Sequence, residues 1–267
     1  MLGLRHLQRV VGNVFKPCVL VPVYNHEHAV ARVVEGARAF DLPVILVDDG
    51  SNASCARELD RLAAADSRIE LLRHTVNRGK GDAMKTGMRN ASARGFTHAM
   101  QIDADGQHAL SDVPRFIDEA RCHPDELICG RPIFDADIPA VRFYGRYFSH
   151  AMVWLETLSL SIPDSMCGLR LYPIKPMIEL IDSTRLGARM DFEIELLVRL
   201  NWRNVPMRWL ATRVTYPSDG VSHYRYVFDN ILVARTHARL LVGMLWRSPV
   251  LFWRNLSRLA SPLRLSP

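Results

Sequence analysis

The sequence lacks the features of several protein classes. Its five cysteines, at positions 18, 55, 122, 129 and 167, form no CxxC pair, so we expect neither a zinc site nor a disulfide framework but reduced thiols in a cytosolic protein. No apolar run reaches about 18 residues, the length expected of a membrane-spanning helix. The N-terminal segment is interrupted by Arg5, His6 and Arg9, so it has no clean signal-peptide core.

Two common nucleotide-binding signatures are also missing. The chain has no GxxxxGK[ST], which excludes a Walker-type P-loop, and no GxGxxG after its first predicted strand, which argues against a dinucleotide fold. It has no repeat and no low-complexity segment. Its 267 residues, 48% apolar and 23% charged, are instead typical of a soluble globular protein with a substantial core.

Short β-rich runs alternate with helical segments from Cys18 to about Gly130. The patterns predict strands at 19–23, 44–47, 69–72, 99–102 and 127–129, and helices at 28–39, 53–65, 81–94 and 111–122. This alternation indicates an α/β fold with right-handed crossovers and a mostly parallel central sheet flanked by helices. Ligands of such sheets bind beyond the carboxyl ends of the strands, where the polar motifs of this chain fall, so we expect one shared crevice.

The pattern is less regular after Arg131. A helix at 142–160, a strand at 167–172, a helix at 190–200 and an amphipathic helix at 226–247 are predicted, and Pro206 and Pro217 punctuate short extended pieces. We therefore divide the chain into an N-terminal segment, 1–16, an α/β catalytic domain, 17–215, and a basic helical extension, 216–267.

Polar turns follow the first two predicted strands. Val21-Pro22-Val23-Tyr24-Asn25 ends the first, and Asp48-Asp49-Gly50-Ser51 ends the second. Acidic side chains at such positions can accept hydrogen bonds from ribose hydroxyls or from a base N–H. The alternative is that they cap the helix that follows.

The turn Asn77–Asp82 precedes the third predicted helix. Gly79 and Gly81 permit close approach of the backbone, Arg78 and Lys80 supply positive charge, and a helix N-terminus favours anions. A nucleoside diphosphate suits such a turn, and a solvated basic turn is the alternative.

The most informative motif is Asp103-Ala104-Asp105, which follows an apolar strand. Two carboxylates one residue apart can bring oxygen ligands to a hard divalent cation. A cation here could bridge a diphosphate and stabilise the charge on a leaving nucleotide. His108 is a further candidate ligand or diphosphate contact, with an exposed loop histidine as the alternative.

In this order, VPVYN, DDGS, NRGKG and DADGQH resemble the motifs of family 2 glycosyltransferases of the GT-A nucleotide-sugar fold, most of all the dolichyl-phosphate mannose and polyprenyl-phosphate glycosyltransferase branch. Weaker similarity continues through Cys167–Arg170 and Met190–Glu195 to about residue 215. The resemblance implies inverting, metal-dependent transfer of one sugar from a UDP- or GDP-linked donor, with Mg²⁺ or Mn²⁺. The implied acceptor is lipid-linked, a polyprenyl phosphate or a glycolipid.

The resemblance also implies roles for individual positions. Pro22, Tyr24 and Asn25 would line the nucleoside pocket, and Asp48 and Asp49 would hold the base and ribose. Lys80 would lie near the diphosphate and Asp103 near the sugar or ribose, while Asp105 would bind the metal with Gln107 or His108. Gly168 and Arg170 would lie beside the acceptor or diphosphate. Processive synthases of the family carry QxxRW, whereas Met207-Arg208-Trp209 lacks the Gln, so we do not expect polymer synthesis.

A general base is needed only if the acceptor is a hydroxyl, because a lipid phosphate is already anionic. Asp191, Glu193 and Glu195 are candidates. Asp191 can equally be the N-cap of its helix, and the glutamates a solvated face. With this alternative left open, we expect Asp103, Asp105 and Asp191 to take part in catalysis.

The net charge of +6 is concentrated at the end of the chain, where seven Arg and one Asp follow Tyr224. His223 and Arg225 lie in a polar loop and can grip a donor diphosphate or an acceptor phosphate, with an ordinary linker as the alternative. The helix after them has an apolar stripe, beside Arg235, Arg239 and Arg247: Val227, Ile231, Ala234, Ala238, Leu241 and Leu245. This pattern suits a membrane interface, and packing on the domain is the alternative.

We therefore expect a protein of the cytoplasm, peripheral at the inner face of the cell membrane, with no nucleic-acid partner. Other acceptors, soluble or lipid hydroxyls, stay open. A sugar-phosphate nucleotidyltransferase is a rival, but such enzymes usually carry a Gly-rich loop with Arg after the first strand, where this chain has VPVYNHEH. A non-catalytic nucleotide-binding module is a second rival, which the intact aspartate pair disfavours.

Overall fold

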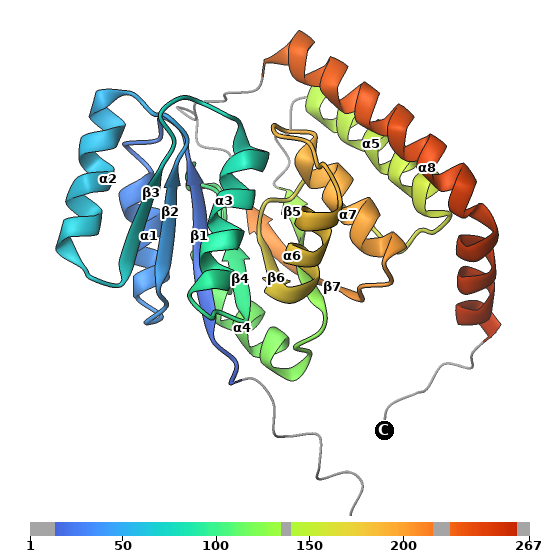
Figure 1. The fold of residues 1–267 in the computed structure, drawn as a ribbon, viewed down its shortest axis with the longest axis horizontal. Helices are drawn as coiled ribbons and strands as arrows, with labels where there is room; N and C mark the ends of the chain where they lie inside the picture. The colour runs from blue at the N-terminus through green and yellow to red at the C-terminus, as the bar shows by residue number, and fades with distance from the viewer. Residues whose placement is uncertain (1–13, 135–139, 216–224, 261–267) are drawn as a thin grey trace, which may run out of the picture.

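The computed structural model describes residues 14–134, 140–215 and 225–260, and within them one seven-stranded sheet lies between layers of helices (Figure 1). The strands are β1 Pro17–Val23, β2 Val44–Asp48, β3 Ile69–Arg73, β4 His98–Gln101, β5 Leu127–Phe134, β6 Arg170–Pro173 and β7 Met207–Val214. The helices are α1 Val30–Arg38, α2 Ala53–Ala65, α3 Lys80–Ala93, α4 Val113–Cys122, α5 Ala140–Thr157, α6 Ile174–Ser183, α7 Phe192–Trp202 and α8 Tyr226–Ala260, with a 3₁₀ turn at Leu110–Asp112. The predicted α/β architecture is confirmed.

The strand order, β3-β2-β1-β4-β6-β5-β7, divides the sheet into two parts. Strands β1 to β4 run parallel, β5 and β7 run parallel, and β6 is antiparallel to both β4 and β5. Because Gln101 pairs with Arg170, the start of β6 lies at the carboxyl end of β4. The two parts of the chain therefore meet where Asp103 follows β4.

The strands of the first part are apolar because helices cover both faces of the sheet. In β1, PCVLVPV, every residue after Pro17 is buried. One core cluster joins α3, α6 and α7 to one face, and another joins α1, α2 and α4 to the other. Met84 and Met88 of α3 have no exposed surface, and burying such a side chain contributes about 1.5–3 kcal/mol.

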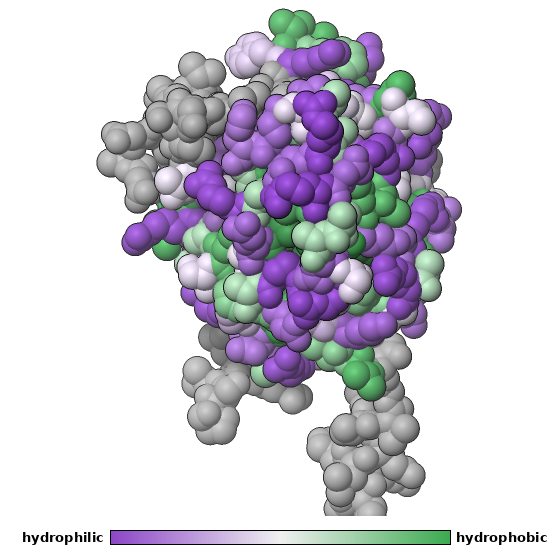
Figure 2. Space-filling view, turned by 90° about the vertical axis from the view of Figure 1, so that its left-hand side faces the viewer, coloured by the Kyte–Doolittle hydropathy of each residue, from purple (hydrophilic) through white to green (hydrophobic). Residues whose placement is uncertain are grey.

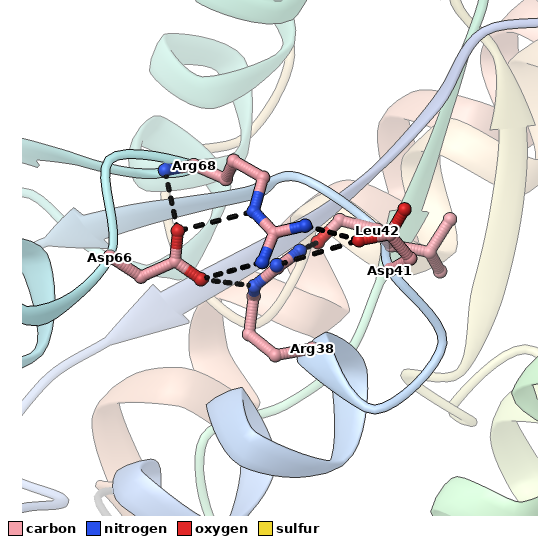
Figure 3. Close-up of polar contacts among 5 residues, drawn as sticks. All are labelled: Arg38, Asp41, Leu42, Asp66 and Arg68. Carbon is pink, nitrogen blue, oxygen red and sulfur yellow. Dashed lines mark hydrogen bonds and ion pairs between the residues drawn. The ribbon is translucent and has the colours of Figure 1, made fainter.

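A cluster of charged residues stabilises the end of the sheet that lies opposite to the polar turns (Figure 3). Arg38 Nε donates to Asp66 Oδ2 at 2.7 Å, and the backbone N–H of Arg68 donates to Asp66 Oδ1 at 2.9 Å. Arg68 also pairs with Asp41. Figure 2 shows that the neighbouring side of the molecule is mostly covered by hydrophilic residues.

The second part of the chain differs most from the sequence predictions. The strand expected at 167–172 is shorter and begins at Arg170, and α6 was not predicted. Between Pro206 and Pro217, where short extended pieces were expected, lies the long strand β7. The last helix continues beyond 247 to Ala260, although Pro249 lies inside it. Proline removes a backbone hydrogen bond and bends a helix, in agreement with the change of direction towards the end of α8 (Figure 1). None of the helices described is long and apolar enough to cross a membrane.

Candidate active site

The polar turns after β1 and β2 lie side by side, because Val23 and Asp48 pair at the ends of these strands. The backbone N–H of Asn25 donates to Ser51 Oγ at 3.1 Å, and Asn25 Oδ1 accepts from the N–H of Asn52 at 2.7 Å. Asn25 has a φ of 54°, in the left-handed region that asparagine tolerates better than most residues. These bonds join the two turns into one polar edge.

Pro22 and Tyr24 lie at this edge. Pro22 is buried within β1, where it pairs with Val47, and Tyr24 is half-buried in the turn that follows. Their position agrees with a pocket beyond the strand ends, but their contact with a nucleoside stays a prediction.

Asp48 is held by protein groups on both oxygens. Its Oδ1 accepts from the N–H of Ser51 at 2.9 Å, and its Oδ2 accepts from Arg73 Nε at 2.8 Å. The carboxylate is almost wholly buried. In this structure Asp48 therefore positions the turn after β2, and its contact with a base or ribose stays a prediction.

Asp49 fixes the turn that precedes α3. Its Oδ1 accepts from the backbone N–H of Arg78 at 2.9 Å, and its Oδ2 from that of Gly79 at 2.7 Å. His74 Nδ1 lies 2.7 Å from Asp49 Oδ1, and His74 Nε2 lies 3.0 Å from Thr86 Oγ1. Because both Asp49 oxygens are used, the second acidic motif and the basic turn form a single rigid unit. Sequence reasoning did not identify His74, which carries no motif of its own.

The glycines of the basic turn have a different partner from the one expected. Gly79 has a φ of 99°, and a Cβ there would lie 2.4 Å from Ala188 O. A Cβ on Gly81 would lie 2.6 Å from Phe192 Cβ. In this structure the glycines thus allow the start of α3 to pack closely on residues 187–192. Their close approach to a diphosphate stays a prediction.

Lys80, the first residue of α3, connects both parts of the chain. Its Nζ lies 2.8 Å from Asp103 Oδ1, beyond β4, and 2.6 Å from Glu193 Oε1, on α7. Sequence reasoning placed Lys80 and Asp103 in one crevice and considered Glu193 only as a candidate base. The structure brings all three together.

The charges of this cluster reinforce one another. Burial by itself would lower the pKa of Lys80, but the carboxylates of Asp103 and Glu193 outweigh it and raise that pKa well above its ordinary value. Burial would likewise raise the pKa of Asp103, but Lys80 and His108 outweigh it and hold that pKa far below its usual range. Lys80 and Asp103 are therefore both charged at neutral pH.

Gln101, the last residue of β4, supports the cluster from the interior. Its Nε2 donates to Glu193 Oε1 at 2.7 Å and to Asp103 Oδ1 at 3.3 Å, while its Oε1 accepts from the hydroxyl of Tyr172 at 3.1 Å. Sequence reasoning missed both Gln101 and Tyr172. A side-chain amide inside an otherwise apolar strand was the available signal, because a buried amide needs hydrogen-bond partners.

Arg170 and Gly168 lie beneath the cluster rather than at its surface. Arg170 has no exposed surface, its Nη2 donates to Ser165 O at 2.8 Å, and its Nη1 lies 3.4 Å from the hydroxyl of Tyr172. In this structure the guanidinium of Arg170 is thus bound by protein groups, and its contact with a diphosphate or acceptor stays a prediction. A Cβ on Gly168 would lie 2.1 Å from Asp103 Oδ2, so this glycine makes room for the carboxylate.

Asp105, Gln107 and His108 form the loop above Asp103. Asp105 Oδ1 accepts from the backbone N–H of Gln107 at 3.0 Å. Burial and the neighbouring Asp103 raise the pKa of Asp105. His108 Nε2 lies 3.6 Å from Asp103 Oδ2, and its buried Nδ1 has no hydrogen-bond partner.

This loop fits a cation that takes only some of its ligands from protein. In residues 14–134, 140–215 and 225–260, no three His, Cys, Asp or Glu side chains lie close enough to hold an ion by themselves. A partly buried carboxylate with a raised pKa and an unpartnered imidazole nitrogen are nevertheless groups that a nearby cation would stabilise. Nucleotide phosphates and water commonly complete the shell of Mg²⁺.

Asp191 and Glu195 have structural partners. Asp191 Oδ2 accepts from the hydroxyl of Thr236 at 3.1 Å, and its Oδ1 from the backbone N–H of Arg189 at 3.2 Å. Asp191 stands at the N-cap position of α7, but its side chain does not cap the helix. Glu195 is wholly buried and binds Arg199 and Arg239. A catalytic role for Asp191 stays a prediction, and of the three candidate bases only Glu193 contacts Lys80.

The two cationic candidates near the last helix have different outcomes. His223 lies outside the described residues. Arg225 precedes α8 and is exposed, and its backbone N–H donates to Asp229 Oδ2 at 2.7 Å. The predicted grip of Arg225 on a phosphate stays a prediction.

Known glycosyltransferases are similar to this chain in sequence. Residues 18–170 match the family described as Glycosyl transferase family 2. A dolichyl-phosphate beta-glucosyltransferase of Dictyostelium discoideum is 27% identical over 222 residues, which cover 74% of this chain and 65% of that protein. A UDP-N-acetylglucosamine–dolichyl-phosphate N-acetylglucosaminyltransferase of Methanococcus voltae is 24% identical over 216 residues, covering 73% of this chain and 85% of that protein.

Solved structures show the same fold. Glucosyl-3-phosphoglycerate synthase of Mycobacterium tuberculosis, in complex with Mn²⁺, UDP-glucose and phosphoglyceric acid, has a TM-score of 0.59 at 14% identity, covering 86% of this chain and 79% of that one. A mannosyltransferase of Pyrobaculum calidifontis, in complex with GDP-mannose and Mn²⁺, has a TM-score of 0.52 at 14% identity, covering 92% and 75%. Both are GT-A glycosyltransferases, so the predicted fold is confirmed.

Proposed function

Because the chain belongs to glycosyl transferase family 2, we propose that it transfers one sugar from a UDP- or GDP-linked donor to a lipid-linked acceptor, a polyprenyl phosphate or a glycolipid. The observation that carries the proposal is the cluster of Lys80, Asp103 and Glu193 beside Asp105, at the carboxyl end of β4. The names of the dolichyl-phosphate relatives support this acceptor class. A lipid-linked acceptor lies in a membrane, and we propose that the protein meets it at the cytoplasmic face.

Donor binding uses the polar edge and the start of α3. The turns after β1 and β2 bind the nucleoside, and the positive end of α3 with Lys80 binds the diphosphate. In this structure Lys80 is shared by two carboxylates, so an arriving diphosphate competes with them for the same ammonium group. Asp103 and Glu193 are then left to accept hydrogen bonds from the hydroxyls of the sugar.

Mg²⁺ or Mn²⁺ is the proposed cofactor, and the Mn²⁺ in two structural neighbours supports a divalent ion. Asp105, with Gln107 and His108, would hold it, and its chemistry would be to offset negative charge on the leaving diphosphate. The raised pKa of Asp105 and the free Nδ1 of His108 support this assignment.

The acceptor attacks from the side opposite to the leaving nucleotide, which inverts the anomeric centre. A phosphate oxygen is already a nucleophilic anion and needs no base. This chemistry agrees with the structure of Asp191, whose two oxygens accept hydrogen bonds from Thr236 and Arg189. If the acceptor were a hydroxyl, Glu193 would be the better-placed base, because it already lies in the cluster.

Transfer can be tested with a panel of UDP- and GDP-sugars, Mn²⁺ and a short-chain polyprenyl phosphate. Release of UDP or GDP and the mass of the extracted lipid are measured. We expect one donor to react, and Asp105→Asn to lower the rate on the order of 100-fold, because charge on the leaving group is then less well compensated. Asp66→Asn, in the cluster of Figure 3, is the matched control and should react normally. Unchanged turnover by Asp105→Asn would contradict the metal role.

A further inference from the structure

The apolar stripe of α8 faces away from the protein. Trp246 and Trp253, seven residues apart and thus on one side of a helix, are 84% and 73% exposed, and Leu245 is 65% exposed. Val227, Ile231, Val242 and Phe252 are exposed as well. In the stripe seen in the sequence, Leu241 alone is half-buried. Large exposed apolar surfaces on a soluble protein mark sites of interaction.

A different side of α8 packs on the domain. Thr236, His237, Leu240, Met244 and Leu251 are buried against the neighbouring helices α5 and α7. Packing on the domain therefore explains the apolar residues on one face of α8 but not those of the outward stripe. Packing on the domain and binding to a partner are both possible for one helix because they use opposite faces.

Exposed aromatic side chains of α5 lie beside α8. Tyr147 and Phe148 are exposed, and the Phe148 ring lies edge-on to His237 of α8, with 6.5 Å between ring centroids. Figure 1 shows α5 and α8 side by side along one flank of the molecule. We call nine of the exposed apolar residues of the two helices the docking face: Tyr147, Phe148, Val227, Ile231, Val242, Leu245, Trp246, Phe252 and Trp253.

The charge around the docking face has one sign. The sequences of α5 and α8 contain one carboxylate each, Glu156 and Asp229, and both are wholly buried. Arg235, Arg239 and Arg247 lie among the exposed residues of α8; Arg239 pairs with Glu195, whereas no carboxylate of the described residues pairs with Arg235 or Arg247. A symmetric contact with a second copy of the chain would bring Arg235 and Arg247 of both copies into one interface without a compensating carboxylate. An anionic surface is therefore the complementary partner.

We infer that the docking face binds the interface of a lipid bilayer that contains anionic lipids. Tryptophan prefers the headgroup region, arginines attract anionic headgroups, and a helix of 35 residues provides about 50 Å of contact length. This inference deepens the proposed function. It rests on that function for one point, namely that the protein should meet a membrane. Binding to vesicles needs neither donor nor acceptor, so it can be tested separately.

The inner side of α8 ties the docking face to the candidate site. Asp229 Oδ1 accepts from Arg189 Nε at 3.1 Å, and Arg189 Nη1 donates to Asn77 Oδ1 at 3.3 Å, at the start of the basic turn. Thr236 donates to Asp191. A bilayer bound to the outer face of α8 would therefore lie at a fixed position relative to Lys80 and its partners.

Sedimentation with vesicles tests the inference. The full chain is mixed with vesicles of phosphatidylcholine alone, or of phosphatidylcholine with about 30% of the anionic lipid phosphatidylglycerol. The fraction of protein bound to the vesicles is then measured. We expect binding to the anionic vesicles only, at least about tenfold weaker binding for Trp246→Glu/Trp253→Glu, and about fivefold weaker binding for Arg235→Gln. Phe40→Glu, an equivalent change at a half-exposed aromatic beyond α1, should bind like the wild type.

Folding and self-association are checked in the same samples. Circular dichroism should show equal unfolding midpoints for all variants, and Arg235→Gln keeps the test valid if the tryptophan variant does not fold. Equal binding of the wild type and both variants would overturn the inference, as would a wild-type dimer that the tryptophan change dissociates in the absence of lipid. Loss of transfer with vesicle binding intact would count against the proposed function alone.

Discussion

Replacing Lys80 by methionine should destabilise the protein strongly at neutral pH. The change keeps the length of the side chain and removes the charge that faces Asp103 at 2.8 Å and Glu193 at 2.6 Å. Removing one partner of a fully buried ion pair costs about 3–5 kcal/mol. The Lys80, Asp103 and Glu193 side chains keep 19%, 21% and 10% of their surface exposed, so solvent weakens the effect. We expect a loss of about 2–4 kcal/mol, or about 6–12 °C in Tm.

The pH dependence of this loss gives a sharper test. In the wild type the lowered pKa of Asp103 contributes stability that is present above the ordinary carboxyl range and is lost as the pH falls through the lowered pKa. Without Lys80, only His108 offsets the effect of burial on Asp103, so the pKa of Asp103 should be higher than in the wild type, and the variant should gain relative stability when the carboxyl becomes protonated. The difference from the wild type should thus shrink between pH 8 and about pH 5.

The assay is urea or thermal unfolding followed by circular dichroism at several pH values. Lys80→Arg, which keeps the positive charge, is the matched control and should lose much less stability. An unfolding midpoint of the methionine variant equal to that of the wild type at pH 7.5 would refute the reasoning. A difference that widens on acidification would refute it as well.

Three further changes test other positions. Gly168→Ala should lower turnover by about 100-fold and also lower the unfolding midpoint, because its Cβ would push the Asp103 carboxylate away from Lys80; steady-state kinetics and a melting curve decide this. Asp164→Asn should cost about 2 kcal/mol at pH 7, because His150 and Arg146 outweigh burial and lower the pKa of Asp164 from 3.8 to about 2. This contribution to stability is present above pH 3.8 and is lost as the pH falls through about 2. Unfolding measured at several pH values should therefore show the stabilities of the wild type and the variant converging in acid. Asp66→Asn should cost about 1 kcal/mol and leave donor affinity unchanged, as measured by unfolding and calorimetry.

The first part of the fold could be predicted because its signals are local. Apolar runs and turn residues indicated β1, β2 and β4 to within a residue or two, and the parallel arrangement then placed Asp49, Lys80 and Asp103 at one edge. The partners of these side chains could not be predicted in the same way. Gln101 meets Glu193 across 92 residues of sequence, a contact that depends on how α7 packs on α3.

The second part carried ambiguous signals. The strand β6 has only four residues, so the sequence indicated a strand there, at 167–172, but neither its exact bounds nor its antiparallel direction. In α8 the outward stripe and the buried stripe are both rich in apolar residues, so periodicity predicted a helix without showing which side the domain would cover. The role of Arg170 was implied by the family resemblance, and its complete burial follows from its place in β6, between β4 and β5.

The position of β6 has a consequence for how the protein matures. A nascent chain releases β1 to β4 from the ribosome long before residues 170–173, so the parallel strands can pair while one edge of β4 is still bare. Such an edge is a template for wrong pairing until the late strand inserts and closes it. The same insertion brings Gly168 beneath Asp103. Synthesis must therefore pass through a stage in which the polar turns exist without the cluster of Lys80, Asp103 and Glu193, which becomes complete only when β6 and α7 have joined the sheet.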